Sequence, residues 1–284
     1  MKKSIFKRPQ SRRNFLRTAA IAGLAVATPW RNALAQNHRV ENVGLQLYSL
    51  RREMGQDFEG TLARLAEIGF KEMEFAGYFD KSPAEVKSIL DNNGLISPAA
   101  HINLNAIRDN LQAEIEKAAT IGQKYIVVPS LPGDERSLDH YARHAETLNR
   151  AGEACKEVGI QMGYHNHSFE FEVQNGKMGY DSLLNLTEPD LVTMEMDLYW
   201  IVNAGQDPIP YFENYPGRFA LLHIKDRASD GSMVDVGHGT IDFANLLAYV
   251  EIAGFEHYFI EHDNPDDGIN SIAYSYNTLN RLRF

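Results

Sequence analysis

Two histidines and a carboxylate follow an apolar stretch near the middle of the chain. Residues 160–162 are mostly apolar and lead into residues 163–171, which read GYHNHSFEF. His165 and His167 are two positions apart, so both side chains point to one face of an extended chain. Histidine is the commonest metal ligand and a frequent acid–base group. This segment predicts a metal or acid–base site, or else two histidines hydrogen-bonded into a loop.

Other short apolar segments of the chain also end in ionisable residues. Asp197 and Glu261 each end such a segment, and His223 and Lys225 lie together at the end of another. The corresponding positions earlier in the chain hold Gln46, Tyr48, Glu74 and His101. Burying such groups costs free energy unless they are paired or coordinated. Their repetition therefore indicates one shared site rather than scattered exceptions.

Eight short, mostly apolar segments alternate with eight helical patterns, and glycines lie just before several of the apolar segments. We expect strands over 43–50, 72–75, 95–101, 125–129, 160–165, 191–197, 219–225 and 258–261. Among the helices, we expect one over 107–121, one over 138–158 and one over 242–253. This alternation predicts a single-domain α/β fold, the (β/α)8 or TIM barrel. A doubly wound sheet is disfavoured because no glycine-rich fingerprint follows the first strand.

The barrel places the carboxyl ends of all strands on one face, where active sites of this fold lie. His165, Asp197, His223 and Glu261 come from strands five to eight, and neighbouring strands are about 5 Å apart. Four inward side chains can therefore converge on one ion. Mixed imidazole and carboxylate ligation suits Mn²⁺, Zn²⁺, Fe²⁺ or Co²⁺ better than Ca²⁺. Such an ion could hold a carbonyl and a hydroxyl oxygen and stabilise an enediolate.

The first 35 residues have the form of an export signal rather than part of the fold. Twin arginines, Arg12 and Arg13, precede a modestly apolar run over 19–28, and residues 33–35 offer an A-x-A cleavage site. The apolar run is too short for a permanent membrane anchor. We expect a twin-arginine signal over 1–35, a mature chain from near Gln36 to residue 284, and a periplasmic location.

The charge balance limits the classes of partner. The chain has 38 Asp+Glu against 28 Lys+Arg, a formal net charge of −10. Nucleic acid and anionic membranes are therefore poor partners, and a small carbohydrate suits the polar strand ends better. Cys155 is the only cysteine, so an intrachain disulfide is ruled out. The sequence is compatible with a homo-oligomer.

The motifs together resemble the xylose-isomerase-like TIM-barrel superfamily of sugar isomerases and epimerases. They are GYHNH at 163–167, MDLYW at 196–200, HIKD at 223–226, GHGTIDF at 237–243 and IEHD at 260–263. The resemblance implies a divalent metal held by a Glu, an Asp, a His and a second Glu from strands five to eight. The last three ligands fall on Asp197, His223 and Glu261. It also implies proton abstraction next to a sugar carbonyl.

The chain departs from the family pattern at two positions. His165 stands where the family has its first Glu, while Glu170 lies farther along the loop as an alternative ligand or a substrate contact. Trp200 stands where many epimerases carry a His, and would offer a stacking face for a sugar. The symmetric epimerisation by two carboxylate bases is therefore in doubt, although a histidine can still bind the metal.

We assign roles on this basis. His167 or Glu261 would abstract the proton, and Lys225 or His101 would stabilise the developing oxyanion. Lys225 could instead form a salt bridge with Glu195 or Asp226. Residues expected to contact the substrate are Gln46, Tyr48, Glu74, Glu170, Trp200 and Arg227.

Three functions are open from the sequence. The first is a metal-dependent sugar isomerase or epimerase that works through an enediolate. The second is a lyase or hydratase acting on 3-keto-glycosides or 3-keto-sugars, which the substitution at position 165 favours. The third, from a different class, is a periplasmic sugar-binding protein without catalysis. A binding protein should hold no stoichiometric transition metal, so metal analysis separates it from the other two.

Overall fold

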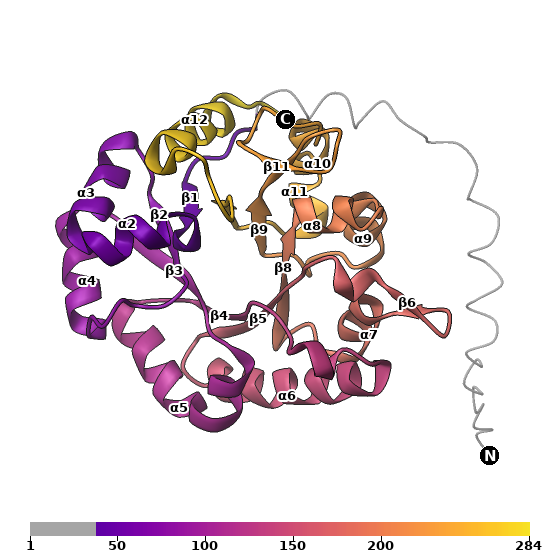
Figure 1. Ribbon diagram of the computed structural model, residues 1–284. Helices are drawn as coiled ribbons and strands as arrows, with labels where there is room; N and C mark the ends of the chain where they lie inside the picture. Colours follow the sequence, from indigo (N-terminus) through magenta and orange to yellow (C-terminus); the bar gives the residue numbers. More distant parts are fainter. Residues whose placement is uncertain (1–37) are drawn as a thin grey trace, which may run out of the picture. The chain divides into compact units, whose positions relative to one another are not determined.

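The described residues, 38–284 of a computed structural model, form a closed barrel of eight parallel strands surrounded by helices (Figure 1). The strands are β1 (Val43–Gln46), β2 (Glu72–Phe75), β3 (Ile96–His101), β4 (Tyr125–Val128), β5 (Gln161–His165), β8 (Val192–Asp197), β9 (Leu221–Ile224) and β12 (His257–Ile260). Each strand pairs with the next in this order, and β12 closes the barrel on β1. The predicted TIM barrel is confirmed. The expected export signal lies outside the described residues.

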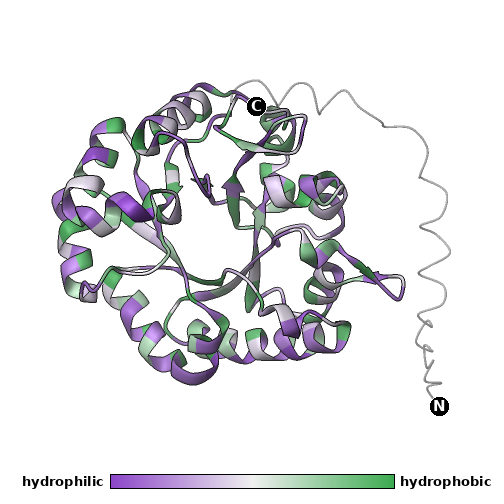
Figure 2. Cartoon of the chain, in the orientation of Figure 1, coloured by the Kyte–Doolittle hydropathy of each residue, from purple (hydrophilic) through white to green (hydrophobic). Residues whose placement is uncertain are grey.

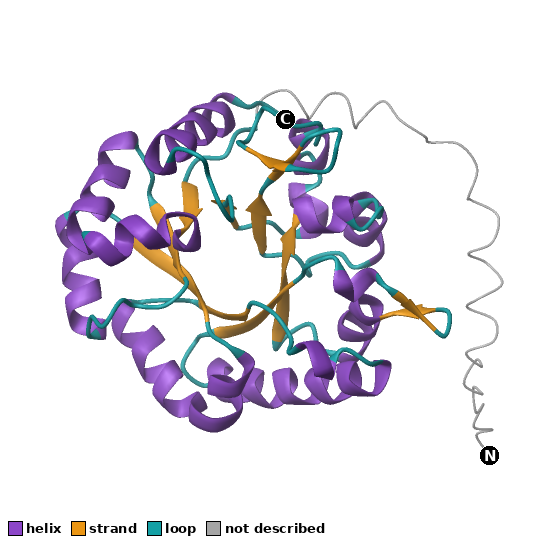
Figure 3. Ribbon diagram, viewed as in Figure 1, coloured by secondary structure: helices purple, strands orange, loops and turns teal. Residues whose placement is uncertain are grey.

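The helices form the outer ring, as the colouring by secondary structure shows (Figure 3). They are α2 (Arg51–Gln56), α3 (Phe58–Ile68), α4 (Pro83–Asn92), α5 (Leu104–Ile121), α6 (Leu138–Lys156), α7 (Gly179–Leu186), α8 (Leu198–Asn203), α9 (Pro208–Asn214), α10 (Phe243–Leu247), α11 (Val250–Ala253) and α12 (Gly268–Arg281). Among the described residues, no helix is both long and apolar enough to cross a bilayer.

The strands form the core of the barrel, and they are apolar on both faces, as parallel strands covered by helices must be. Hydrophobic residues concentrate along the strands and on the inward sides of the helices (Figure 2). A small inner cluster fills the lower barrel, with Val127, Leu221 and Phe259 at its centre. This apolar layer lies below the polar groups that gather at the carboxyl ends of the strands, where active sites of this fold lie.

Two regions differ from the sequence expectation. The first strand ends at Gln46, and the 3-10 helix η2 (Leu47–Leu50) follows, so Tyr48 lies on a turn rather than in the strand. The helix expected over 242–253 is broken at residues 248–249 into α10 and α11. Two short hairpins were also not anticipated: β6 (Val173–Gln174) with β7 (Lys177–Met178), and β10 (Asp226–Arg227) with β11 (Met233–Val234).

Candidate metal and substrate site

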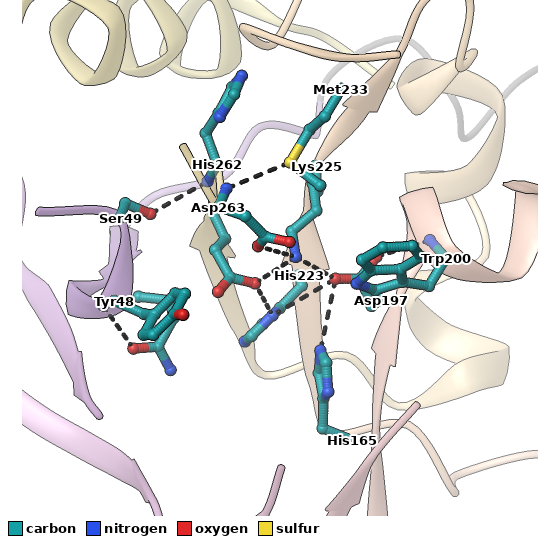
Figure 4. Close-up of polar contacts among 12 residues, drawn as sticks. Tyr48, Ser49, His165, Asp197, Trp200, His223, Lys225, Met233, His262 and Asp263 are labelled. Atoms are coloured by element: carbon teal, nitrogen blue, oxygen red, sulfur yellow. Dashed lines mark hydrogen bonds and ion pairs between the residues drawn. The ribbon is translucent and has the colours of Figure 1, made fainter. Parts of the chain in front are cut away.

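Four side chains from neighbouring strands converge at the carboxyl end of the barrel (Figure 4). His165 ends β5, Asp197 ends β8, His223 is the third residue of β9, and Glu261 directly follows β12. One potential ligand atom of each lies within 4.8 Å of those of the other three. All four residues are buried. The structure thus brings together the four residues that the sequence suggested as metal ligands.

The distances within this cluster are those of groups facing a common point. His165 Nε2 lies 3.4 Å from Asp197 Oδ2, and His223 Nδ1 lies 3.7 Å from the same oxygen. His223 Nδ1 and Glu261 Oε2 are 2.7 Å apart. Neither of these two buried atoms makes a hydrogen bond of good geometry, although Glu261 Oε2 is also ion-paired with Lys225 Nζ at 2.7 Å. A divalent cation coordinated by both atoms would satisfy the His223 nitrogen and add positive charge beside the Glu261 carboxylate, so the donor set fits a metal.

Hydrogen bonds on the far side of each imidazole fix which nitrogen faces the cluster. His165 Nδ1 lies 3.0 Å from the carbonyl oxygen of Pro129, which can only accept, so Nδ1 carries the proton and Nε2 is free to ligate. His223 Nε2 lies 2.7 Å from Glu74 Oε2, which directs Nδ1 toward Asp197 and Glu261. Both rings are therefore oriented before any metal binds.

Asp197 is held by both its backbone and its side chain. Oδ1 accepts the backbone N–H of Trp200 at 2.8 Å and caps α8, while Oδ2 turns toward the cluster. Asn166 holds the backbone of Asp197 through two hydrogen bonds. Its side chain accepts from Asp197 N at 3.1 Å and donates to Asp197 O at 3.3 Å. Burial opposes ionisation of this carboxyl, but the Lys225 ammonium and the hydrogen bonds of His165 and His223 together hold the pKa of Asp197 well below its usual range.

Lys225 is fully buried among three carboxylates. Its Nζ lies 3.0 Å from Asp197, 2.7 Å from Glu261 and 2.9 Å from Asp263. Burial favours the neutral amine, but these three carboxylates outweigh it and raise the pKa of Lys225 above its ordinary value. In turn, burial acts to raise the pKa of Glu261, but Lys225 and His223 together lower it below its ordinary value. The partner Asp226 expected from the sequence instead accepts backbone N–H groups of Gly237 and Gly239 at 2.9 Å.

A second polar layer lies beneath the first and contains a residue that the sequence reading missed. Glu195 Oε2 lies 2.6 Å from His101 Nε2 and 3.3 Å from His223 Nε2. Glu74 completes this layer, bound by the Gln46 amide at 2.8 Å. Burial, and then the charge of Glu195, raise the pKa of Glu74 to about 7. Glu195 could have been identified from the sequence, because it stands two residues before Asp197 and so faces the same side of β8.

An open cavity of about 580 Å³ reaches the cluster from solvent. Of the predicted site residues, it is lined by Tyr48, His101, His165, His167, Lys225 and Glu261. Gln46 and Glu74 are fully buried beneath it, so their predicted role as substrate contacts is corrected to one of support. Trp200 and Arg227 are not among its lining residues, and the Arg227 guanidinium binds the Asn203 side chain at 3.1 Å instead.

Tyr48 forms a fixed wall at the mouth of this cavity. Its ring is 43% exposed, and the Arg51 guanidinium lies 4.2 Å from the ring centroid. Arg51 in turn donates to Asp263 O at 2.6 Å and to the Asn264 side chain at 2.7 Å. The segment after β12 is also tied to η2, since His262 N donates to Ser49 Oγ at 3.0 Å. These contacts position Glu261 and the aromatic wall together (Figure 4).

Comparison with known proteins gives the family. A family model described as "Xylose isomerase-like TIM barrel" matches residues 62–278. The chain belongs to this family. Inosose dehydratase of Lacticaseibacillus casei is 25% identical over an alignment of 257 positions that covers 75% of this chain and 85% of that protein. A sugar phosphate isomerase/epimerase structure from Parabacteroides distasonis is 30% identical with a TM-score of 0.72, covering 92% of this chain and 98% of that one. A structure of IOLI protein with a bound zinc atom is 16% identical with a TM-score of 0.67, covering 84% and 96%, and shows the shared fold.

The fifth strand supplies His165, whose ring lies in the cluster, whereas Glu170, the alternative ligand expected from the sequence, does not belong to it. The Glu170 carboxylate accepts from the Tyr164 hydroxyl and from His167 N, at 2.7 and 2.8 Å. Because Tyr164 and His165 are neighbours on β5, they point to opposite faces, so Glu170 lies outside the barrel and its predicted substrate contact is wrong.

His167 lines the cavity beside the cluster as a neutral imidazole. Burial, and then the neighbouring His165 ring, lower the pKa of His167 to about 3. Its ring lies against those of Phe169 and Trp200, with centroids 5.6 and 5.4 Å away. A neutral ring is in the protonation state that a base needs, whereas a pKa this low disfavours the imidazolium that proton transfer would form.

Glu170 gives this family member a testable pH dependence of stability. Burial raises the pKa of its carboxyl from 4.5 to about 7. The folded state therefore holds a proton that the unfolded state releases, and stability contributed by Glu170 is full below about pH 4.5 and lost as pH rises through about 7. We expect Glu170→Gln to flatten this decline, by up to about 3 kcal/mol between pH 5 and 8. Urea unfolding at several pH values measures it, and an unchanged slope would refute the assignment.

Proposed function

We propose that this protein is an enzyme of the sugar isomerase/epimerase-like type, which abstracts a proton next to a sugar carbonyl at a divalent metal. The observation that carries the proposal is the buried His223 Nδ1, which has no hydrogen-bond partner and faces the carboxylates of Asp197 and Glu261 beside an open cavity. A non-catalytic sugar-binding protein has no need of this paired, desolvated donor set.

The metal, when bound by His165, Asp197, His223 and Glu261, would act as a Lewis acid toward a substrate ketone and a neighbouring hydroxyl. The zinc atom in the IOLI protein structure supports a transition metal at the site of this chain. The identity of that metal stays open among Mn, Zn, Co and Fe. His167 lines the same cavity in its neutral form and accepts the proton from carbon. Lys225 keeps its ammonium charged and stabilises negative charge on oxygen. His101, which also lines the cavity, can donate to the same oxygen.

A second candidate, elimination or hydration next to the ketone, is favoured by two observations. The fifth strand ends in His165, an imidazole of lowered pKa, and not in the carboxylate that a symmetric pair of carboxylate bases would need. Several relatives, including that of Lacticaseibacillus casei, are inosose dehydratases. In this reaction the C–H electron pair forms a double bond while the neighbouring C–O bond breaks, and its oxygen leaves with a proton. The first step is common to both candidates.

Incubation in D₂O tests that common step. We expect the metal-loaded protein to exchange the hydrogen on the carbon beside the ketone in at least one member of a panel of sugars and 3-keto-sugars. Chelation should abolish the exchange, and the product should separate isomerisation from elimination. A purified protein that holds no stoichiometric transition metal and exchanges no hydrogen in the panel would instead be a binding protein.

A further inference from the structure

The cavity extends well beyond the metal cluster. One part is lined by His101, His165, His167 and Lys225, the residues that the proposed chemistry uses. Another part, which we call the distal lobe, is lined by Tyr78, Asn103, Ala106, Glu114 and Lys117. The whole cavity has a volume of about 580 Å³. A single hexose fills roughly 150–200 Å³ at condensed-phase packing density, so one ring leaves most of the cavity to solvent.

The distal lobe is lined by both parts of α5. Ala106 lies in the first turns of the helix, and Glu114 and Lys117 lie farther along it. The backbone of Asn110 is non-helical, so α5 changes direction between Ala106 and the part that carries Glu114 and Lys117. The lobe therefore takes lining residues from both sides of this bend, and the volume of the whole cavity leaves room for more than one sugar ring.

The chemistry of the distal lobe suits an uncharged, hydroxyl-bearing ring. Lys117 Nζ lies 2.8 Å from Glu114 Oε1, so the two opposite charges balance and still offer both donors and acceptors. Tyr78 adds an aromatic face, and its position is fixed because its hydroxyl donates to the Gln123 side chain at 3.0 Å. A phosphate or carboxylate would need an unpaired cation, and both Lys117 and the deeper Lys225 are already paired with carboxylates.

We propose that the distal lobe is a second-ring subsite, and that the substrate class is a glycoside with its ketone-bearing ring at the metal cluster and its second ring along α5. This inference rests on the proposed function for the placement of the first ring. It makes Ala106 a determinant of specificity, because a larger side chain there fills the lobe without touching the cluster. Lys117 and Glu114 bind the hydroxyls of the second ring.

Two matched probes test the subsite in the metal-loaded protein. Methyl 3-keto-β-glucoside carries one ring, and 3-keto-cellobiose carries two. We expect hydrogen exchange in D₂O with a kcat/KM about tenfold or more higher for the two-ring probe. Ala106→Trp should abolish this preference and leave exchange with the one-ring probe unchanged. Asn105→Trp is the control, because the neighbouring Asn105 is exposed and lies outside the lining.

Binding without turnover separates failure of the subsite from failure of the proposed chemistry. Calorimetry should show cellobiose binding the wild type more tightly than methyl β-glucoside, and Lys117→Ala should reduce that difference without the added bulk of tryptophan. Equal affinity and equal kcat/KM for one-ring and two-ring probes would overturn the subsite and leave the proton abstraction standing. Absence of exchange with every probe would overturn the proposed chemistry, and calorimetry alone would then decide the subsite.

Discussion

The Asp197→Asn variant should lose its bound metal and about 10³-fold or more of its hydrogen-exchange activity while the barrel stays folded. The Oδ2 atom of Asp197 lies 3.4 Å from His165 Nε2 and 3.0 Å from Lys225 Nζ. An amide in this place removes the negative charge that attracts a cation. Asparagine still accepts the backbone N–H of Trp200, so the cap of α8 is kept.

The measurements are metal content by mass spectrometry, exchange in D₂O and circular dichroism. Asp181→Asn is the matched control, because Asp181 is a partly buried carboxylate on α7 that pairs with the Tyr211 hydroxyl, outside the barrel. That variant should keep metal and activity. Unchanged metal content in Asp197→Asn, with the fold intact, would show that the ligand assignment is wrong.

The barrel could be predicted because its local signals agree with its packing. Ser82 caps α4 with Glu85 in a reciprocal pair, and Pro83 opens the helix, which are signals that the sequence carries locally. Gly122 ends α5 with a positive φ of 94°, a conformation that costs a glycine little. The break between α10 and α11 was not predictable in this way, because its apolar pattern continues across residues 248–249.

The candidate site shows the same contrast between features that local sequence signals determine and features that depend on tertiary contacts. Side chains at strand ends were found because strand geometry fixes the direction in which they point, and Asp197, His223 and Glu261 follow from it. Glu170 was misplaced because its position depends on the Tyr164 hydroxyl on the outer face of β5, a contact that no spacing in the sequence encodes. The sequence also suggested the wrong ion-pair partners for Lys225. One of its actual partners, Asp263, belongs to the loop after β12 and approaches Lys225 only when the barrel closes.

Lys225→Met should destabilise the metal-free protein by about 3–5 kcal/mol. The variant leaves Asp197, Glu261 and Asp263 without the ammonium that lies within 3.0 Å of each. Asp197 and Glu261 are buried, so the negative charges that remain are poorly solvated. Lys87→Met is the control: Lys87 pairs with Asp91 on the surface of α4, and its loss should cost at most about 1 kcal/mol. Urea unfolding with a chelator present measures both.

The pH dependence and the response to metal identify the cause of this loss. Lys225 is the main influence that lowers the pKa values of Asp197 and Glu261 in the folded protein. Stability from these lowered pKa values is present above the unfolded values near pH 4 and lost as pH falls below them. The difference between variant and wild type should therefore be largest at neutral pH and shrink on acidification. A divalent metal supplies positive charge to the same carboxylates, so saturating metal should recover much of the loss. Equal losses in Lys225→Met and Lys87→Met, or a loss independent of both pH and metal, would contradict the view that Lys225 holds the empty site together by charge.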